Sequence, residues 1–248
     1  KEMICTFNKN ARIFARVSYT PSTFGEMIRN DFLRVFGFNA PLMNKIYPKA
    51  MYDREFVRCF GESQFDTVID YSGYGSFYSI LLLSGKNAKK LIWQHNDLLT
   101  EKNKKVNGKK PHRRELRVVF STYQFFDKIV GCSEATMNVN LEKIGYKELK
   151  DKCAFVRNAA NFDRVLAGSK DSFTRETAAK LGLPELLNKG LTSFVNMGRL
   201  SPEKNQAALI KAFAQFNKEY PKTRLYIIGD GSGVTHSLSH ASASGVYV

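Results

Sequence analysis

The stretch FVNMGRLSPEKNQAALIKAFAQFNKEYPKTRLYIIGDGS, residues 194–232, decides the fold because it contains one complete strand, helix and strand. Strands are expected over 192–196 and 223–228, and the second runs into Gly229, Asp230 and Gly231. Between them, residues 202–220 carry apolar side chains at helical spacing, at positions 207, 209, 210, 212, 213 and 216. A strand, helix and strand of these lengths predict two parallel strands joined by a helical crossover.

The same alternation occupies the preceding part of the chain. We predict strands over 66–70, 89–93, 128–131 and 153–156, and helices over 77–83, over 114–126 and from Ser133, as N-cap, to about Gly145. An earlier helix over 25–36 is indicated by Phe24, Met27, Ile28, Phe32 and Val35. Alternating strands and helices imply parallel sheets covered on both faces, so we predict an α/β protein with two Rossmann-like lobes.

The lobes are predicted to meet where this pattern pauses, in the polar stretch 161–190. We therefore assign residues 1–158 to an N-terminal lobe and 159–248 to a C-terminal lobe. An amphipathic segment is expected at about 175–181 within the polar stretch. The final residues, GVTHSLSHASASGVYV, hold neither a convincing helix nor a strand long enough to finish a sheet, so the C-terminal lobe is expected to be incomplete.

Composition bounds the classes of function. The chain has 38 basic and 23 acidic residues, a net charge of +15, so its surface should attract polyanions such as anionic lipid, nucleic acid or phosphorylated substrates. The longest aliphatic run, 80–83, is far too short to span a bilayer. Four scattered cysteines without a Cys-x-x-Cys pair favour reduced thiols and a cytoplasmic location.

The segment KNKKVNGKKPHRR, residues 102–114, concentrates seven lysines and arginines. Such a run of charges is usually a solvated loop. The more specific hypothesis is a surface that attracts anionic lipid or polymer. Nucleic acid is disfavoured because no aromatic residues are interleaved as stacking platforms. Residues 102–117 are therefore the predicted place of peripheral contact with an anionic membrane, and they carry an alternative function, that of a non-catalytic basic module that binds anionic polymer or nucleic acid.

The cations Arg199 and Lys204 flank the predicted start of the helix at 202. Ser201 suits the N-cap and Pro202 the first helical position, which puts Lys204 in the first turn, where the helix dipole disfavours it by about 0.3–1 kcal/mol. A diphosphate held by the two cations and the backbone amides would reverse that sign. The alternative, which needs no ligand, is that Lys204 extends into solvent and Arg199 pairs with a nearby acid.

The quoted stretch closely resembles the donor-binding lobe of family 4 glycosyltransferases, which are retaining enzymes of the GT-B type. The resemblance rests on G-R-L followed by a lysine, an amphipathic helix, a proline, a strand and G-D-G. FVRNAANFD resembles the crossover between lobes, with Ala159 in place of the usual Gly, and IWQHND resembles the strand that delivers a histidine to the cleft. VIDYSGYGS, IWQHND and FDKIVGCSEAT are similar to members that build capsule, teichoic acid or related cell-envelope polymers.

This resemblance implies a two-lobed, GT-B-like enzyme with an acceptor-side N-terminal lobe and a nucleotide-sugar-binding C-terminal lobe. It would be a retaining glycosyltransferase of the hexosyltransferase type, acting on a polysaccharide, teichoic-acid or lipid-linked acceptor at the inner face of the membrane. Arg199 and Lys204 would bind the donor diphosphate, and His95 would face the reacting sugar, oriented by Asp97. The remaining candidates would line the cleft: Gly73, Gly75, Asn96, Asp97, Asn158, Gly198, Gly229 and Gly231.

No cofactor or metal is expected beside the donor substrate. His236 and His240 are four residues apart, but their serine-rich surroundings do not indicate a helix and no third ligand is evident. In the family, a pair of glutamates eight apart follows G-D-G, and the chain is expected to end before that place. Without that donor-contacting glutamate, residues 1–248 alone are not expected to be fully active.

Overall fold

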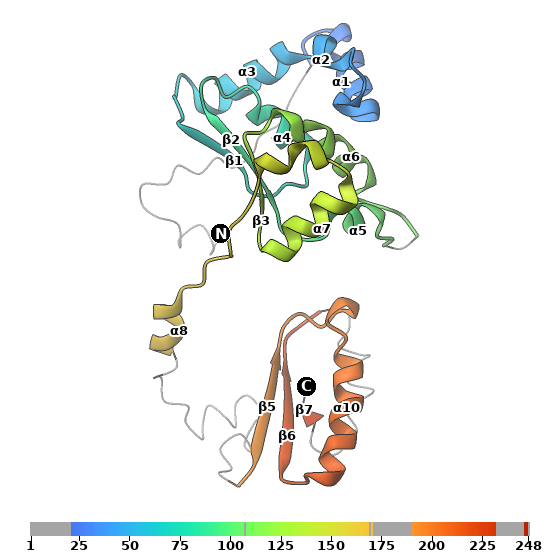
Figure 1. Cartoon of the computed structure of the whole chain (residues 1–248), viewed down its shortest axis with the longest axis vertical. Helices are drawn as coiled ribbons and strands as arrows, with labels where there is room; N and C mark the ends of the chain where they lie inside the picture. The colour runs from blue at the N-terminus through green and yellow to red at the C-terminus, as the bar shows by residue number, and fades with distance from the viewer. Residues whose placement is uncertain (1–20, 107, 169, 171–189, 232–245, 248) are drawn as a thin grey trace. The chain divides into compact units, whose positions relative to one another are not determined.

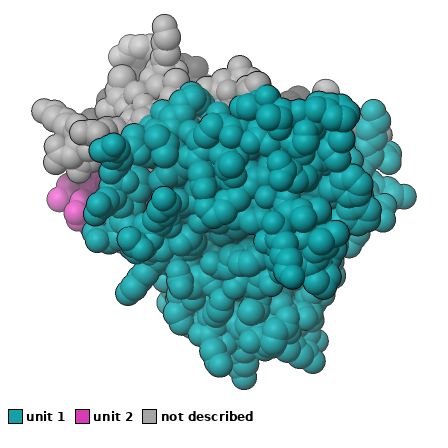
Figure 2. All heavy atoms as spheres, turned by 90° about the horizontal axis from the view of Figure 1, so that it is seen from above, with its two compact units in different colours: residues 1–160 teal, residues 161–248 magenta. Residues whose placement is uncertain are grey.

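The computed structural model describes residues 21–106, 108–168, 170, 190–231 and 246–247 (Figure 1). The chain divides into two compact units, unit 1 from Lys1 to Ala160 and unit 2 from Asn161 to Val248, which are coloured separately in Figure 2. The predicted amphipathic segment at 175–181 and both His236 and His240 lie outside the described residues.

Unit 1 is built on a sheet of four parallel strands in the order β1-β2-β3-β4. Backbone pairing aligns Thr67 with Lys89, Leu91 with Lys128 and Ile129 with Cys153. All four carboxyl ends therefore meet at one edge of the sheet, where open α/β sheets bind ligands. The strands are β1 (Thr67–Asp70), β2 (Lys89–Gln94), β3 (Lys128–Gly131) and β4 (Cys153–Phe155).

The helices of unit 1 begin and end where local chemistry favours it. The Ser133 hydroxyl accepts a hydrogen bond from the Thr136 amide, and Gly145 closes the same helix in the left-handed conformation. The helices are α1 (Phe24–Phe36), α2 (Met43–Ile46), α3 (Lys49–Phe60), α4 (Ser76–Leu82), α5 (Leu98–Asn103), α6 (Arg113–Thr122) and α7 (Glu134–Ile144), with 3₁₀ turns η2 (Gly37–Asn39), η3 (Tyr123–Phe125) and η4 (Lys147–Lys152).

A buried polar network fixes the carboxyl end of β2. The Gln94 amide donates to the hydroxyls of Tyr123 (3.1 Å) and Tyr146 (2.8 Å), and its oxygen accepts from Asn140. Asn140 also donates to the carbonyl of Asn96 (2.9 Å) and accepts from the Leu98 amide (2.9 Å). Because these buried side chains hydrogen-bond one another, burying them costs little free energy, and the network holds residues 94–98 in one conformation.

Unit 2 contains three parallel strands in the order β5-β6-β7. One helix, α10, packs its apolar side on the sheet, where Ile210 and Phe213 form a core with Leu200, Leu225 and Ile227. The elements of the unit are α8 (Phe162–Gly168), β5 (Thr192–Met197), η6 (Pro202–Lys204), α10 (Gln206–Glu219), β6 (Thr223–Ile228) and β7 (Val246–Tyr247). The predicted α/β fold with parallel sheets is confirmed.

The start of the helix after β5 was predicted wrongly. The α-helix begins at Gln206, because Asn205 has a positive φ of 50° that interrupts the helical path. Residues 202–204 form the separate 3₁₀ turn η6, in which the Lys204 amide bonds the Ser201 carbonyl at 2.9 Å. Ser201 is therefore not the N-cap of α10, and Lys204 precedes the α-helix instead of lying in its first turn, so the predicted dipole penalty does not apply.

The helix predicted over 25–36 is confirmed as α1, but it is turned the opposite way from an ordinary surface helix. Its buried residues are Glu26, Asn30 and Leu33. The apolar residues whose spacing predicted it are exposed, from 37% for Val35 to 72% for Phe24. Periodicity thus located the helix and misassigned the side that faces the protein.

Candidate functional site

In unit 2 the predicted donor-binding residues lie together at the carboxyl ends of β5 and β6. The loop after β5 runs beside the loop after β6, and two backbone hydrogen bonds join them. The Gly198 amide donates to the Ile228 carbonyl and the Leu200 amide to the Asp230 carbonyl, both at 3.0 Å. The strand order therefore brings Gly198 and Arg199 next to Gly229 and Gly231 although thirty residues separate them in sequence.

Glycine is required in the second loop because the two backbones approach closely. A Cβ at Gly229 would lie 1.9 Å from the Gly198 carbonyl oxygen, and one at Gly231 would lie 2.4 Å from that of Leu200. Both distances are far below van der Waals contact, so any side chain would force the loops apart. The absence of side chains at Gly229 and Gly231 thus allows the Arg199 backbone to lie against the end of β6.

The cations of this loop, Arg199 and Lys204, are exposed. Neither Arg199 nor Lys204 forms an ion pair with a carboxylate of the residues that the structure describes. The Gln206 amide donates to the Arg199 carbonyl at 3.1 Å and so fixes the loop to the first residue of α10. Beside them the Ser201 hydroxyl is buried and has no hydrogen-bond partner within the described ranges.

In unit 1 the glycine loop after β1 is held by Asp70, the last residue of that strand. Its carboxylate accepts hydrogen bonds from the Gly73 amide (2.9 Å) and the Ser79 hydroxyl (2.6 Å). Gly73 has a φ of 64°, and a Cβ there would lie 2.1 Å from the Trp93 carbonyl oxygen. The loop can therefore cross the end of β2 only with glycine at this position.

Gly75 precedes helix α4, whose first residue is Ser76. Glu115 of α6 accepts hydrogen bonds from the Ser76 amide (3.0 Å) and hydroxyl (2.5 Å). A carboxylate of the chain itself thus occupies the amino terminus of α4, where unpaired amides favour an anion. Gly75, predicted to line the cleft, immediately precedes this helix end, whose amides Glu115 already neutralises from within the protein.

His95 lies directly after β2, half-buried, with its ring against the β1 loop. Its Nε2 atom is 2.6 Å from the Tyr71 carbonyl oxygen, and the Tyr71 and His95 rings meet edge to face at 4.7 Å. Because a carbonyl only accepts hydrogen bonds, Nε2 carries the proton when the ring is neutral and Nδ1 is left as an acceptor. The Cys132 thiol donates to the His95 carbonyl at 3.2 Å.

The neighbours of His95 are engaged elsewhere. Asn96 donates to the Tyr74 hydroxyl at 2.9 Å. Asp97 caps α5 through the Thr100 amide and pairs with Lys143. Partial burial raises the pKa of Asp97, but the hydrogen bonds from Lys143 and Thr100 outweigh it and leave that pKa below its ordinary value. No hydrogen bond between Asp97 and His95 exists in the described structure, so the predicted orienting role of Asp97 is corrected.

Asn158 follows β4 on the same edge of the sheet and is exposed. The candidates of unit 1 therefore come from the segments after β1, β2 and β4, and those of unit 2 from the segments after β5 and β6. Each group lies at the carboxyl edge of its own sheet.

The basic segment 102–117 is only partly free in solvent. Lys102 stacks 5.4 Å from the centre of the Phe120 ring, and burial there, with Arg117 and Arg113 nearby, lowers the pKa of Lys102. Arg117 donates to the Arg34 carbonyl at 3.4 Å. Val106 and Lys109 form an isolated antiparallel bridge in the segment between α5 and α6.

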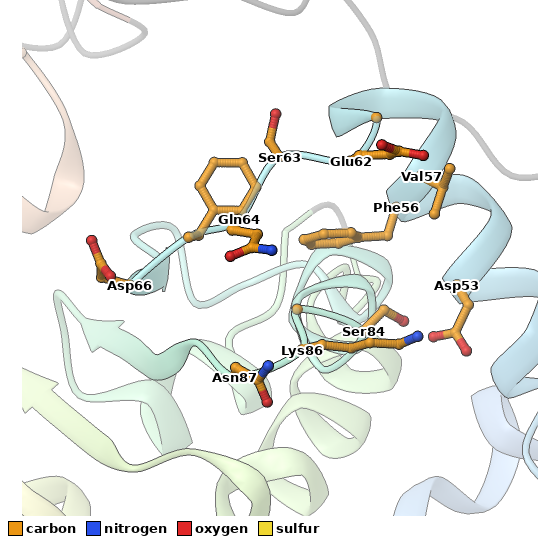
Figure 3. A pocket seen from close by; sticks show the side chains of 13 residues that line it. Asp53, Phe56, Val57, Glu62, Ser63, Gln64, Asp66, Ser84, Lys86 and Asn87 are labelled. Atoms are coloured by element: carbon orange, nitrogen blue, oxygen red, sulfur yellow. The ribbon is translucent and has the colours of Figure 1, made fainter.

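A cavity of about 380 Å³ lies at the opposite, amino-terminal edge of the unit 1 sheet (Figure 3). In Figure 3 the Phe56 ring from α3 and the Gln64 side chain point toward one another, and Lys86 extends in the direction of Asp53. The cavity is lined by residues of α3, by the segment after α3 and by the segment after α4, which meet only in the folded chain, so no sequence pattern indicated it. It contains none of the predicted site residues.

Two kinds of site are absent from the part of the chain that the structure describes. It contains no group of three or more His, Cys, Asp or Glu side chains suited to a metal ion. Nor does any helix in the described ranges combine the length and apolar character needed to cross a bilayer.

Two known proteins are similar to parts of the chain at low sequence identity. The chain is 24% identical over 147 residues to an uncharacterized glycosyltransferase of Methanocaldococcus jannaschii, a match that covers 58% of this chain. It covers 32% of that relative, so the chain spans about a third of the curated protein it matches. The N-terminal domain of Candida albicans trehalose-6-phosphate phosphatase aligns at a TM-score of 0.49 and 12% identity, over 78% of this chain and 44% of that one, which is too low to bear on function.

A family model matches the part of the chain that carries the candidate donor site. The family is described as "Glycosyl transferases group 1", and the match covers residues 178–246, which include Gly198, Arg199, Lys204, Gly229 and Gly231. The segment that holds these two exposed cations is thus similar to a glycosyl transferases group 1 domain.

Proposed function

We propose that the chain is the core of a retaining glycosyltransferase of family 4, which moves a sugar from a nucleotide-diphosphate donor to a cell-envelope polysaccharide, teichoic-acid or lipid-linked acceptor. The observation that carries the proposal is the pair Arg199 and Lys204, exposed at the carboxyl edge of a parallel sheet without a carboxylate partner among the described residues. A similar edge binds phosphorylated ligands in other α/β proteins.

The donor diphosphate is proposed to bind to the loop 198–204. Arg199 would provide planar, charge-assisted hydrogen bonds and Lys204 a compact positive charge. The Ser201 hydroxyl supports this place: it is buried without a hydrogen-bond partner among the described residues, which costs about 1–3 kcal/mol, and a phosphate oxygen would satisfy it. Gly229 and Gly231 keep the loop against β6 in the conformation that presents these groups.

The reaction proposed for this site is transfer with retention at the anomeric carbon. Cleavage of the bond to the donor leaves negative charge on the diphosphate, which Arg199, Lys204 and backbone amides would stabilise. The departing phosphate oxygen would take the proton of the acceptor hydroxyl on the same face of the sugar. In this scheme the protein cations neutralise the leaving group, so no metal ion or other cofactor is invoked, and His95 is assigned to the reacting sugar.

The acceptor and location are proposed on the resemblance to cell-envelope enzymes and on charge. A net charge of +15 favours work beside anionic polymers or lipids. The exposed cations of 102–117 would give peripheral contact with the inner face of the membrane, and the protein would otherwise be cytoplasmic.

The test is titration calorimetry of the full chain with UDP, GDP and CDP, because the donor nucleotide is not assigned. One of the three should bind, and Arg199→Ala and Lys204→Ala should each weaken it by about 10- to 100-fold, the worth of a charge-assisted hydrogen bond. The matched control is Lys218→Ala, an exposed lysine at the other end of α10, which should leave affinity unchanged.

Three outcomes would contradict the proposal. Absence of binding by all three nucleotides would contradict the proposed donor site. Equal losses in Lys218→Ala and Lys204→Ala would mean non-specific attraction of anions to a basic protein. Binding of anionic polymer that alanines in 102–117 abolish and Arg199→Ala leaves intact would favour the non-catalytic basic module.

A further inference from the structure

Three aromatic side chains meet at the carboxyl edge of the unit 1 sheet, and we call them the aromatic platform: Tyr71, Trp93 and His95. The centre of the Tyr71 ring lies 5.6 Å from that of Trp93, with the rings tilted by 40°, and 4.7 Å from that of His95. Tyr71 is 59% exposed, and the other two are half-buried. The platform therefore presents an aromatic surface to solvent beside the residue assigned to the reacting sugar.

The backbone fixes the position of this surface. Tyr71 directly follows β1, and the parallel register of β1 and β2 sets it beside Trp93. The Tyr71 carbonyl accepts the hydrogen bond of His95 Nε2 at 2.6 Å, and Gly73 lets the following residues cross the end of β2. Because more than half of its surface stays in water, the Tyr71 ring adds little to folding stability, and its placement calls for another explanation.

Neutral hydrogen-bonding groups border the platform. With Nε2 donating to Tyr71, the His95 ring keeps Nδ1 as an acceptor. Ser72 is exposed next to Tyr71. Asn96 is exposed too and donates its side-chain nitrogen to the Tyr74 hydroxyl, so its side-chain oxygen is still able to accept. Aromatic rings bordered by such groups fit a ligand that has an apolar side and several hydroxyls.

The platform is neutral, although the chain has a net charge of +15. The segments after β1 and β2, residues 71–75 and 95–96, contain no lysine, arginine, aspartate or glutamate. The next residue, Asp97, is paired with Lys143. Arg157 follows β4, which the strand order places three strands from β1, about 14 Å across the sheet. The end of β1 and β2 therefore favours a neutral ligand over a phosphorylated one.

We propose that the aromatic platform binds a sugar ring of the acceptor, which makes the acceptor a neutral saccharide where it meets unit 1. One face of a pyranose consists of C–H groups, and their partial positive charge lies favourably against the negative face of an aromatic ring. The sugar hydroxyls would bond His95 Nδ1, Ser72 and Asn96. The inference rests on the proposed function, since only transfer makes this saccharide an acceptor, and it narrows the acceptor classes given above.

Two other ligand classes fit these residues less well. A nucleotide would also stack on the rings, but it would bring its phosphates to strand ends without cations, whereas Arg199 and Lys204 offer cations in unit 2. An isoprenoid chain would cover Ser72 and Asn96 without bonding them, which costs free energy. A saccharide contacts the rings and satisfies the polar groups together.

The experiment is titration of the full chain followed by the fluorescence of Trp93, its single tryptophan. The probes are trisaccharides of glucose, mannose, galactose and N-acetylglucosamine, with glycerol 3-phosphate and farnesyl phosphate for the other acceptor classes. At least one trisaccharide should change the emission in a saturable way, and the two phosphates should not. Tyr71→Ala should weaken that binding by about tenfold, and Tyr71→Phe, which keeps the ring, by less than about twofold.

Two further variants make this result specific. Tyr71→Leu keeps an apolar side chain without a ring and should lose as much affinity as Tyr71→Ala. The matched control is Tyr220→Ala, which removes a tyrosine of similar exposure, 54%, that stacks on Phe216 at 4.6 Å after α10. It should bind the trisaccharide as the unchanged protein does. Circular dichroism during urea denaturation should give one midpoint for all variants, which separates loss of binding from loss of folding.

Several outcomes would overturn the inference. These are absence of binding by every trisaccharide, equal losses in Tyr71→Ala and Tyr220→Ala, and full affinity in Tyr71→Leu. A change of Trp93 emission by farnesyl phosphate or glycerol 3-phosphate alone would overturn it as well, in favour of a lipid-linked or phosphate-containing acceptor.

Nucleotide titration separates this inference from the proposed function. Tyr71→Ala should leave the affinity for UDP, GDP or CDP unchanged, because Arg199 and Lys204 belong to unit 2. If no nucleotide binds while a trisaccharide still binds through Tyr71, the transferase proposal fails and the saccharide site stands. If a nucleotide binds and no trisaccharide does, the donor site stands and the saccharide inference fails.

Discussion

Helices α1 and α10 have similar lengths and similar apolar spacing, yet they face opposite ways. α10 buries Ile210 and Phe213 against its sheet. α1 exposes its equivalent residues and buries Glu26 and Asn30. The spacing of apolar residues therefore defines a helix with two unlike sides, and the element beside it determines which side is buried.

The neighbours of the two helices explain the difference. α10 lies on Leu225 and Ile227 of β6, an apolar surface that only apolar side chains can cover. Its buried Asn217 is satisfied locally by the Thr223 carbonyl and hydroxyl, both at 3.0 Å. α1 lies beside Tyr52 and Arg54, whose polar groups require partners. The four predictions below test this contrast, from the largest expected effect to the smallest.

The largest effect is expected from Phe213→Ala in α10. The Phe213 ring is 6% exposed and packs edge-on against Phe194 at 5.9 Å, so its removal leaves a cavity in the small core of unit 2. We expect a loss of about 4 kcal/mol in the free energy of unfolding of that unit. Hydrogen exchange of β6 amides measures it. The single tryptophan of the chain, Trp93, lies in unit 1, so its unfolding transition should not move.

The next effect is expected from Leu33→Ala, which removes a fully buried apolar side chain of α1. It should destabilise unit 1 by about 3 kcal/mol, because Leu33 belongs to the same core as Met51 and Phe56. Urea denaturation followed by Trp93 fluorescence measures the change. A loss below 1 kcal/mol would mean that α1 is held by its polar contacts alone.

Much of this fold could be predicted from the sequence, because short-range patterns encode strands and helix ends. The strand predicted over 223–228 has those bounds in β6, and Ser133 and Gly145 bound α7 as predicted. Those signals are local: β-branched runs, a hydroxyl cap and a glycine that tolerates the left-handed conformation.

What the sequence could not supply are contacts between distant residues. Glu26 meets Arg54, 28 positions away, and Asn140 meets Gln94, 46 positions away. The same limit applies to the candidate site. The carboxyl ends of strands located its residues, but the Tyr71 carbonyl on His95 and the Glu115 carboxylate on Ser76 depend on how elements pack. The φ of Asn205, which moved the start of α10, had no local signal either.

Glu26→Gln should have an intermediate, pH-dependent effect. The Arg54 hydrogen bond, with that of the Ser22 amide, lowers the pKa of Glu26 from 4.5 to about 2. The stability that this carboxylate contributes is therefore complete above pH 4.5 and is lost as the pH falls toward 2. At pH 7 the variant should be less stable by about 2 kcal/mol, the worth of hydrogen bonds to a charged group.

Denaturation at pH 7, 4 and 3, followed by Trp93 fluorescence, measures the difference between the unchanged protein and Glu26→Gln. The difference should shrink across that range. Glu62→Gln, an exposed glutamate after α3, is the control and should differ from the unchanged protein by less than about 0.5 kcal/mol throughout. A gap between Glu26→Gln and the unchanged protein that stays constant from pH 7 to 3 would contradict the assigned pKa.

The smallest effect is expected from Ile28→Ser in α1, and the same substitution at Ile210 in α10 makes the comparison direct. Ile28 is 38% exposed and Ile210 is 1% exposed, although both occupy the apolar positions of their helices. Ile28→Ser should change the stability of unit 1 by less than about 0.5 kcal/mol, as surface substitutions do, because folding removes little of its surface from water. Ile210→Ser should instead leave a hydroxyl in the core and cost unit 2 several kcal/mol, about 3 or more. Similar losses at the two positions would mean that α1 buries its apolar side in solution, and the contrast between the helices would then be lost.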